Sequence, residues 1–232
     1  QKYNIEDKAN PFDYGFNYKE LTYKSGKINL SGWFIDNSDA EKTLIICHGR
    51  GVNRLSSLQY LQILKDTELD KEYSIFIPDL RNSGKSDEAK TKLGYDFAQD
   101  IFHTMEMLNE RYNKNNFTLF GFSQGGMGSA IVSKLYLKPM RKKGLKIDKL
   151  ILDSSISNVK KRIKEDEKKR KVPKFIVSVV VRVFNLRVGN NLDKLRLSYL
   201  LKRVPTLIIQ TMNDKATTYG MLMEEYNEIS QN

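Results

Sequence analysis

The residues Gly121-Phe122-Ser123-Gln124-Gly125 place a hydroxyl nucleophile between glycines. An apolar run, 117–122, leads up to the serine, and a run of small and apolar residues follows it to residue 135. This order predicts a strand that turns directly into a helix, with the serine hydroxyl exposed at the turn. Glycines on both sides allow neighbouring backbones to approach without a Cβ clash. An ordinary glycine-rich turn is the alternative, but the strand and helix patterns favour a nucleophilic Ser123.

The segments around this serine alternate between strand and helix patterns. Residues 16–25 and 27–36 predict a β-hairpin, and apolar runs at 42–49, 73–80, 116–122, 147–155 and 204–214 predict buried strands. Helical patterns cover 55–69, 95–112, 124–137 and 219–230. The alternation predicts an α/β fold with a mostly parallel central sheet and helices on both faces, as one domain over 1–232. The segment of about 155–203 has no strand pattern, and we expect it to form a helical lid.

Three further motifs resemble the α/β-hydrolase superfamily. "IICHGRG" at 45–51 resembles the loop after the third strand, and "PDLRNSGKSD" at 78–87 resembles the turn after the fourth. "PTLIIQTMNDKATTYG" at 205–220 resembles the segment that presents the catalytic acid. In the second motif we expect Asp79 to organise the loop around Arg81 and Ser86. The resemblance extends from about Tyr18 to Asn232.

The resemblance implies acyl transfer by a serine–acid–histidine triad. It assigns the nucleophile to Ser123 and the acid to Asp214, although Asp214 could instead be a turn or N-cap residue. Asp153, at the end of the preceding strand, is the competing acid. The oxyanion hole would use the backbone N–H groups of Arg50 and Gln124.

The triad histidine is the difficulty, because the chain contains only His48 and His103. His48 lies in the loop motif, where we expect a structural role, and His103 lies within a predicted helix, where we expect a helix-packing or surface role. The family order places the histidine after the acid. We therefore expect a further strand and a histidine within about 30 residues beyond Asn232, and residues 1–232 alone to be nearly inactive. A histidine-free pseudohydrolase that serves as a binding module is the alternative.

Charge and composition limit the partners. The net charge is +11, and residues 160–174 hold nine Lys or Arg against three acids. The basic run lacks stacking aromatics, which argues against nucleic acid. It leads into the apolar run 175–181, which suits either an anionic membrane surface or a lid over the site. The insertion is similar to that of family members anchored by their N-terminus outside the cytoplasm, and the start at Gln1 fits a removed anchor or a trimmed chain; a cytoplasmic protein is the alternative.

The sequence thus predicts a serine hydrolase that cleaves carboxylic esters or thioesters of a small-molecule or acyl substrate. An aminopeptidase or other amidase is the alternative within the same fold. No metal or cofactor is expected, since no ligand cluster is present. The single cysteine, Cys47, lies within an apolar run, and we expect it to be a buried small hydrophobe.

Overall fold

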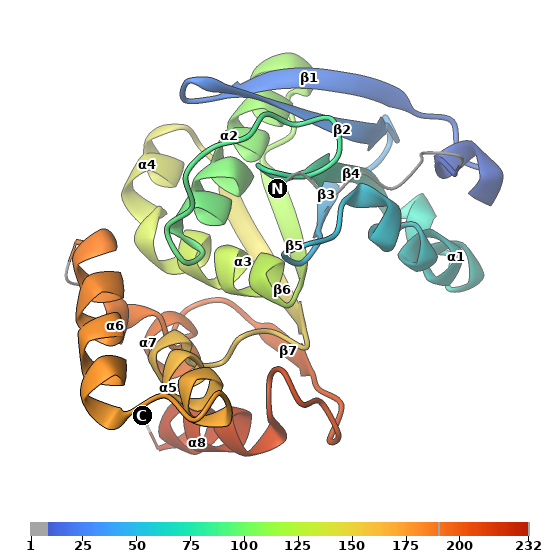
Figure 1. Ribbon diagram of the computed structural model, residues 1–232. Coiled ribbons are helices and arrows are strands. Elements are labelled where there is room, and N and C mark those ends of the chain that lie inside the picture. Colours follow the sequence, from blue (N-terminus) through green and yellow to red (C-terminus); the bar gives the residue numbers. More distant parts are fainter. Residues whose placement is uncertain (1–8, 190, 232) are drawn as a thin grey trace.

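The computed structural model describes residues 9–189 and 191–231 and is built around a seven-stranded sheet (Figure 1). Gln1 and Asn232, the expected ends of the domain, lie outside the described residues. Across the sheet the strands follow the order β1-β2-β4-β3-β5-β6-β7. Their bounds are β1 Lys19–Ser25, β2 Ile28–Ile35, β3 Lys42–Cys47, β4 Tyr73–Asp79, β5 Asn116–Phe122, β6 Lys146–Asp153 and β7 Thr206–Ile209.

The first two strands pair antiparallel, as the predicted hairpin requires, and β2 also pairs antiparallel with β4. All other neighbours are parallel. The carboxyl ends of β3, β5, β6 and β7 therefore meet at one edge of the sheet, where parallel α/β folds place their ligand sites.

Two apolar cores explain why the central strands are continuously hydrophobic. In β3, Ile45 and Cys47 pack into one core, while Leu44 and Ile46 pack into the other. Successive side chains point to opposite faces of the sheet, so a strand covered on both faces must be apolar at every position. Helices α2 (Tyr95–Tyr112), α3 (Gln124–Leu135) and α4 (Leu137–Lys142) contribute to the first core, and α1 (Gln59–Asp66) contributes to the second. The predicted fold class is confirmed.

The helix expected over 55–69 is shorter than its apolar pattern. A 3₁₀ turn, Arg54–Ser57, precedes α1, and another, Leu69–Lys71, follows it; two more span Pro11–Tyr14 and Leu192–Lys194. Arg54 explains the first turn. Its backbone N–H donates to Asp79, and its buried guanidinium bonds Glu20 and stacks over Trp33 at 4.1 Å. These fixed contacts hold residues 54–57 outside the path of the helix.

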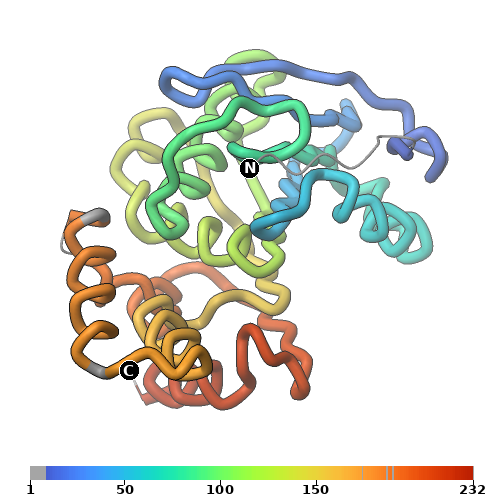
Figure 2. Tube along the Cα trace, viewed as in Figure 1, coloured from blue at the N-terminus to red at the C-terminus, as the bar shows by residue number. Residues whose placement is uncertain are grey.

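The insertion at 155–203 is helical, as expected from its pattern. It contains α5 (Val159–Lys169), α6 (Lys174–Arg187) and α7 (Leu197–Leu200), and the chain then returns to β7 and ends in α8 (Tyr219–Ser230). Figures 1 and 2 show these four helices as a layer below the main body, with α6 at its outer edge. Within the part of the chain that the structure describes, no helix is long and apolar enough to cross a membrane.

Candidate active site

Ser123 occupies the turn between β5, which ends at Phe122, and α3, which begins at Gln124. Its φ is 52° and its ψ is −114°, a strained conformation for a residue with a side chain. Two backbone bonds hold it. The Ser123 N–H donates to the Asp153 carbonyl at 2.9 Å, and the Met127 N–H donates to the Ser123 carbonyl at 3.2 Å. The structure therefore forms the strand–turn–helix that the glycine pattern predicts.

The glycines beside Ser123 are required by close backbone contacts. A Cβ on Gly121 would lie 2.5 Å from the Gly126 Cα, and a Cβ on Gly125 would lie 2.5 Å from the carbonyl oxygens of Cys47 and His48. Real Cβ atoms do not come that close. The turn therefore packs directly against the end of β3, which brings the loop after β3 to the nucleophile.

The loop after β3 contacts Ser123. A Cβ on Gly49 would lie 3.2 Å from the Ser123 Cβ, so the backbone passes the serine at van der Waals range. Arg50 follows in this loop, and Gln124 is the first residue of α3, where a backbone N–H has no helical partner. Within the described residues, neither the Arg50 nor the Gln124 N–H donates a hydrogen bond. The two N–H groups assigned to the oxyanion hole are thus both unoccupied and close to the serine in the fold.

Ser123, Arg50 and Gln124 line one cavity of about 400 Å³. Its wall holds both apolar and charged residues, and it includes residues of α5 and α6, from the insertion, that the sequence did not single out. The lining residues are Arg50, Thr91, Leu93, Ser123, Gln124, Met127, Ile156, Val159, Arg162, Ile163, Asp166, Glu167, Arg170, Phe184, Ala216 and Thr217. Nothing in the local sequence links residues 159–184 to the serine, because the contact depends on how the insertion folds back. A second hollow of about 630 Å³ adjoins this cavity and shares Arg50, Thr91 and Gln124 with it.

Asp214 lies in the loop after β7 and is held by its own loop. Its Oδ1 accepts from the N–H groups of Ala216 at 2.7 Å and Thr217 at 3.0 Å. Its Oδ2 accepts from the Thr217 hydroxyl at 2.6 Å and the Gln210 amide at 3.4 Å. Burial raises the pKa of this carboxyl, but the hydrogen bonds from Thr217 and its neighbours outweigh burial, so the net pKa lies below the usual value. The carboxylate is ionised and oriented beside Thr217, which lines the cavity.

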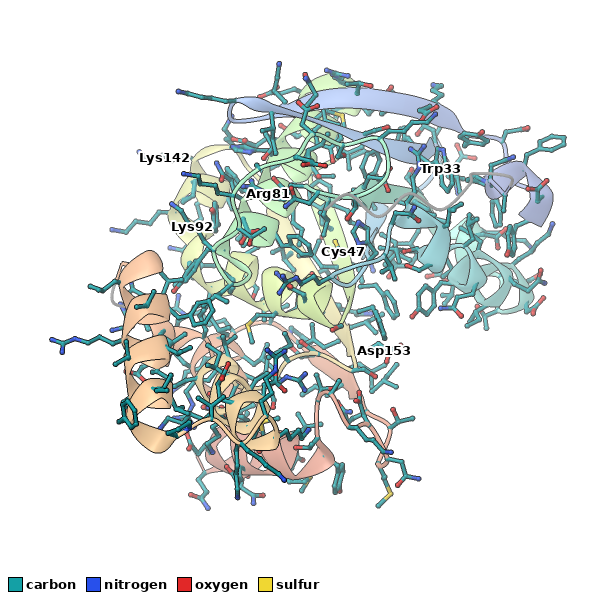
Figure 3. The ribbon with its side chains drawn as sticks, in the orientation of Figure 1. Trp33, Cys47, Arg81, Lys92, Lys142 and Asp153 are labelled. Atoms are coloured by element: carbon teal, nitrogen blue, oxygen red, sulfur yellow. The ribbon has the colours of Figure 1, made fainter. Side chains whose placement is uncertain are left out.

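Asp153, the competing acid, ends β6 at the edge of the sheet that faces the helical layer (Figure 3). Its Oδ2 accepts from the Tyr60 hydroxyl at 3.2 Å, and its Oδ1 accepts from the Ser154 hydroxyl at 3.0 Å. Burial, with the Asp153 charge, raises the pKa of Tyr60 to about 12, so the phenol stays a donor. Asp153 thus contacts α1. Neither Asp153 nor Asp214 lines the cavity that contains Ser123, but Thr217, whose hydroxyl donates to Asp214, does.

His48 is buried, and both of its ring nitrogens bond to the backbone. The Leu80 N–H donates to Nε2 at 2.9 Å, so Nε2 is unprotonated and Nδ1 carries the proton that it donates to the Gly49 carbonyl at 2.7 Å. Burial lowers the pKa of this imidazole, against the opposing charges of Asp79 and Asp100. His48 therefore ties the loop after β3 to the end of β4 and has no nitrogen free to accept a proton from Ser123.

His103 lies in α2 and bonds a different serine. The Ser25 hydroxyl donates its one proton to Asp100 Oδ1 at 2.6 Å, so it accepts from His103 Nδ1 at 2.9 Å. The other ring nitrogen lies 3.7 Å from the Glu106 carboxylate. This packing role agrees with the expectation for His103, which does not line the cavity of Ser123.

Asp79 organises its loop as expected, with one correction. Its Oδ2 accepts from the Lys85 N–H at 3.0 Å, and its carbonyl accepts from the Ser86 hydroxyl at 2.6 Å. The expectation was wrong for Arg81, whose guanidinium forks onto Asp100 at 2.6 and 2.8 Å. Asp100 lies in α2, 19 positions away along the chain. Spacing within the motif could not indicate that partner.

Cys47 is fully buried, as expected, and burial raises the pKa of its thiol to about 12, which keeps it unreactive. Among the described residues, no group of three or more His, Cys, Asp or Glu is arranged to hold a metal ion.

Comparison with known proteins identifies the family to which this chain belongs. A family model described as the alpha/beta hydrolase fold matches residues 42–189, which is more than half of the chain, and the chain belongs to that family. It is 30% identical over 108 residues to the uncharacterized protein YqkD of Bacillus subtilis (strain 168). That match spans 47% of this chain and 33% of YqkD, so the chain matches about a third of that relative.

Solved structures agree on the fold. Esterase Pf2001 of Pyrococcus furiosus superposes with a TM-score of 0.72 at 22% identity, over 100% of this chain and 85% of that one. A putative lipase of Acinetobacter baumannii AYE gives a TM-score of 0.62 at 17% identity, over 94% and 82% of the two chains. A putative aryl esterase of Burkholderia cenocepacia gives 0.59 at 15% identity, over 91% and 86%. At these identities the likeness concerns the fold.

Proposed function

We propose that this protein is a serine hydrolase that cleaves carboxylic ester or thioester bonds. One observation carries the proposal. Ser123, in a strained turn, shares a cavity of about 400 Å³ with Arg50 and Gln124, whose backbone N–H groups have no partner among the described residues. A nucleophile beside unoccupied N–H donors is what acyl transfer requires. The esterase and lipase titles of the structural neighbours support the same reaction class.

In this mechanism the Ser123 Oγ attacks the carbonyl carbon of the bound ester, and a histidine accepts the Oγ proton. The Arg50 and Gln124 N–H groups stabilise the negative oxygen of the tetrahedral intermediate. Asp214 orients the histidine and stabilises its positive charge. The intermediate expels the alcohol or thiol, which takes the proton from the histidine, and water then releases the acid by the same steps.

The histidine of this triad lies outside residues 1–232. Both ring nitrogens of His48 bond to the backbone, and His103, in α2, bonds to Ser25 at the end of β1. Residues 1–232 alone should therefore turn over orders of magnitude more slowly than the full-length protein.

A fluorophosphonate probe tests the nucleophile. We expect the full-length protein to be labelled and Ser123→Ala to be unlabelled, with Ser129→Ala, a buried serine two turns along α3, as the matched control. Labelling of neither the parent nor the variants would leave a pseudohydrolase that binds its ligand without cleavage. Equal labelling of the parent and Ser123→Ala would place the nucleophile elsewhere.

An amidase of the same fold is the second candidate, because the same groups can attack an amide. Paired 4-nitrophenyl ester and 4-nitroanilide substrates with one acyl group separate the two. We expect the ester to be cleaved at least about a hundredfold faster, since no group in the cavity is assigned to protonate an amine leaving group besides the histidine. Comparable rates would favour the amidase.

We propose two roles for the helical insertion. The segment 155–203 acts as a lid over the cavity, and its exposed basic and apolar helices contact an anionic membrane surface. An N-terminal membrane anchor, implied by the resemblance of the insertion, stays a prediction that the upstream coding sequence tests.

A further inference from the structure

The outer face of α6 is an exposed apolar stripe. Five of its large side chains are between 39% and 72% exposed, and at 100° per residue they fall within an arc of about 100°. They are Phe175, Ile176, Val179, Val183 and Leu186. A monomer in water rarely leaves such a stripe uncovered, so the stripe marks an interaction surface.

The opposite face of the same helix is occupied. Val181 and Phe184 pack against the main core, and Phe184 lines the cavity that contains Ser123. The helix is therefore apolar on both sides for two reasons: one side closes the cavity, and the other is left at the surface. Figure 1 shows α6 at the outer edge of the helical layer, away from the sheet.

Exposed cations lie on α6 and on α5 and the turn that precede it. Lys164 and Lys168 on α5, Lys171 in the turn before α6, and Arg182 at the margin of the stripe are exposed. Within the described residues none of the four forms an ion pair, whereas their neighbours Lys160 and Lys161 do. An apolar stripe with unpaired cations beside it matches the polar–apolar boundary of an anionic bilayer.

A second copy of this chain would fit the stripe less well. In a symmetric pair the same patch lies on both subunits, so the unpaired cations of one copy would face those of the other. An anionic surface would instead attract these cations. We propose that the outer face of α6 docks the protein on an anionic phospholipid surface, from which ester substrates enter the adjoining cavity. The entry of ester substrates from this surface rests on the proposed hydrolase function, whereas the docking itself does not.

Vesicle flotation tests the docking directly. The protein used is the full-length chain with Ser123→Ala, so that binding is measured without turnover. We expect flotation with phosphatidylcholine–phosphatidylglycerol vesicles (7:3) and at least about tenfold weaker binding to phosphatidylcholine alone. Val179→Asp/Leu186→Asp should weaken binding to the anionic vesicles by at least about tenfold. Ile63→Asp changes an equally exposed apolar residue of α1 and should bind as the parent does.

A charge-matched pair tests the cations. Lys168→Gln/Lys171→Gln should weaken binding by about tenfold, while Lys24→Gln/Lys27→Gln, on the β1–β2 hairpin, removes the same charge and should change it little. Thermal unfolding of each variant verifies that it is folded. Binding of Val179→Asp/Leu186→Asp equal to the parent overturns the proposal. So does a parent that binds no vesicle and sediments as a dimer that these substitutions dissociate, because the stripe then belongs to a second copy. Fluorophosphonate labelling of the Ser123-containing protein reports the hydrolase function independently of all these outcomes.

Discussion

Ser123 keeps a strained φ because contacts on both sides leave its backbone no alternative. Gly121 lies against Gly126 across the turn, and Gly125 lies against the end of β3. The hydrogen bond from the Ser123 N–H to the Asp153 carbonyl fixes the turn to β6 as well. The strain is thus maintained by three strands, and it directs the serine towards the cavity that residues of α5 and α6 also line.

Gly125→Ala should therefore destabilise the protein by about 1–3 kcal/mol, the usual range for overpacking. The added Cβ would lie 2.5 Å from two carbonyl oxygens, so β3 and α3 must separate. Gly220→Ala, in α8 with open space around it, is the control and should leave the free energy of unfolding unchanged or raise it by up to about 1 kcal/mol. Urea denaturation measures both variants. Equal stabilities would mean that the turn tolerates a Cβ and that the glycines have another role.

For single residues, the sequence identifies those whose role depends on their neighbours in the chain. The glycines, the serine and the apolar flanks of the turn are neighbours in the chain, and they predict the strained turn that the structure contains. The roles of His48 and Arg81 depend instead on Leu80 and Asp100, 32 and 19 positions away. Such pairings follow from how strands and helices pack, which a single sequence does not specify residue by residue.

Among the elements, α8 holds both ends of the insertion through one buried carboxylate. Glu225 accepts from the Asn158 side chain at the start of α5. It also accepts from the Arg196 guanidinium and from the N–H and hydroxyl of Ser198, where the insertion returns to the sheet. These bonds outweigh burial and hold the pKa of Glu225 below its usual value, so the Glu225 carboxylate is ionised.

Glu225→Gln should loosen the packing of the insertion against α8 and destabilise the protein by about 2–3 kcal/mol, because all four bonds lose the carboxylate charge and an amide N–H₂ faces buried donors. Glu224→Gln alters the adjacent residue, whose ion pair with Lys161 is exposed, and should cost less than about 1 kcal/mol. Hydrogen exchange should become faster in α5 and α7 of Glu225→Gln only. Unchanged exchange there would show that the insertion does not depend on the bonds to Glu225.

Element boundaries were predictable where the pattern was long. The helix expected over 95–112 coincides with α2, since its apolar positions repeat through five turns. The helix expected over 55–69 is interrupted at both ends; at its start, buried Arg54 is bound by Asp79 and Glu20 from two strands. The helical insertion was predictable from its lack of a strand pattern, but the stripe on α6 was not, because apolar residues line both sides of that helix.

For the whole molecule, a net charge of +11 opposes association between copies, while the exposed edge of the sheet favours it. β7 is the last strand of the described sheet, and Leu207 and Ile209 on its α1-facing side are 57% and 45% exposed. An exposed apolar edge strand is a template for pairing with another chain.

Residues 1–232 should therefore self-associate through β7, and more strongly as salt screens the charge. The Debye length falls from about 30 Å at 0.01 M to about 10 Å at 0.1 M, which removes repulsion between copies but leaves apolar burial intact. Sedimentation velocity should show association that rises over this range and is strongly reduced by Leu207→Lys. Ile63→Lys, at an equally exposed position of α1, adds the same charge away from β7 and should associate as the parent does. Association that falls with salt, or that both substitutions reduce equally, would mean that charge pairing rather than the strand edge holds the copies together.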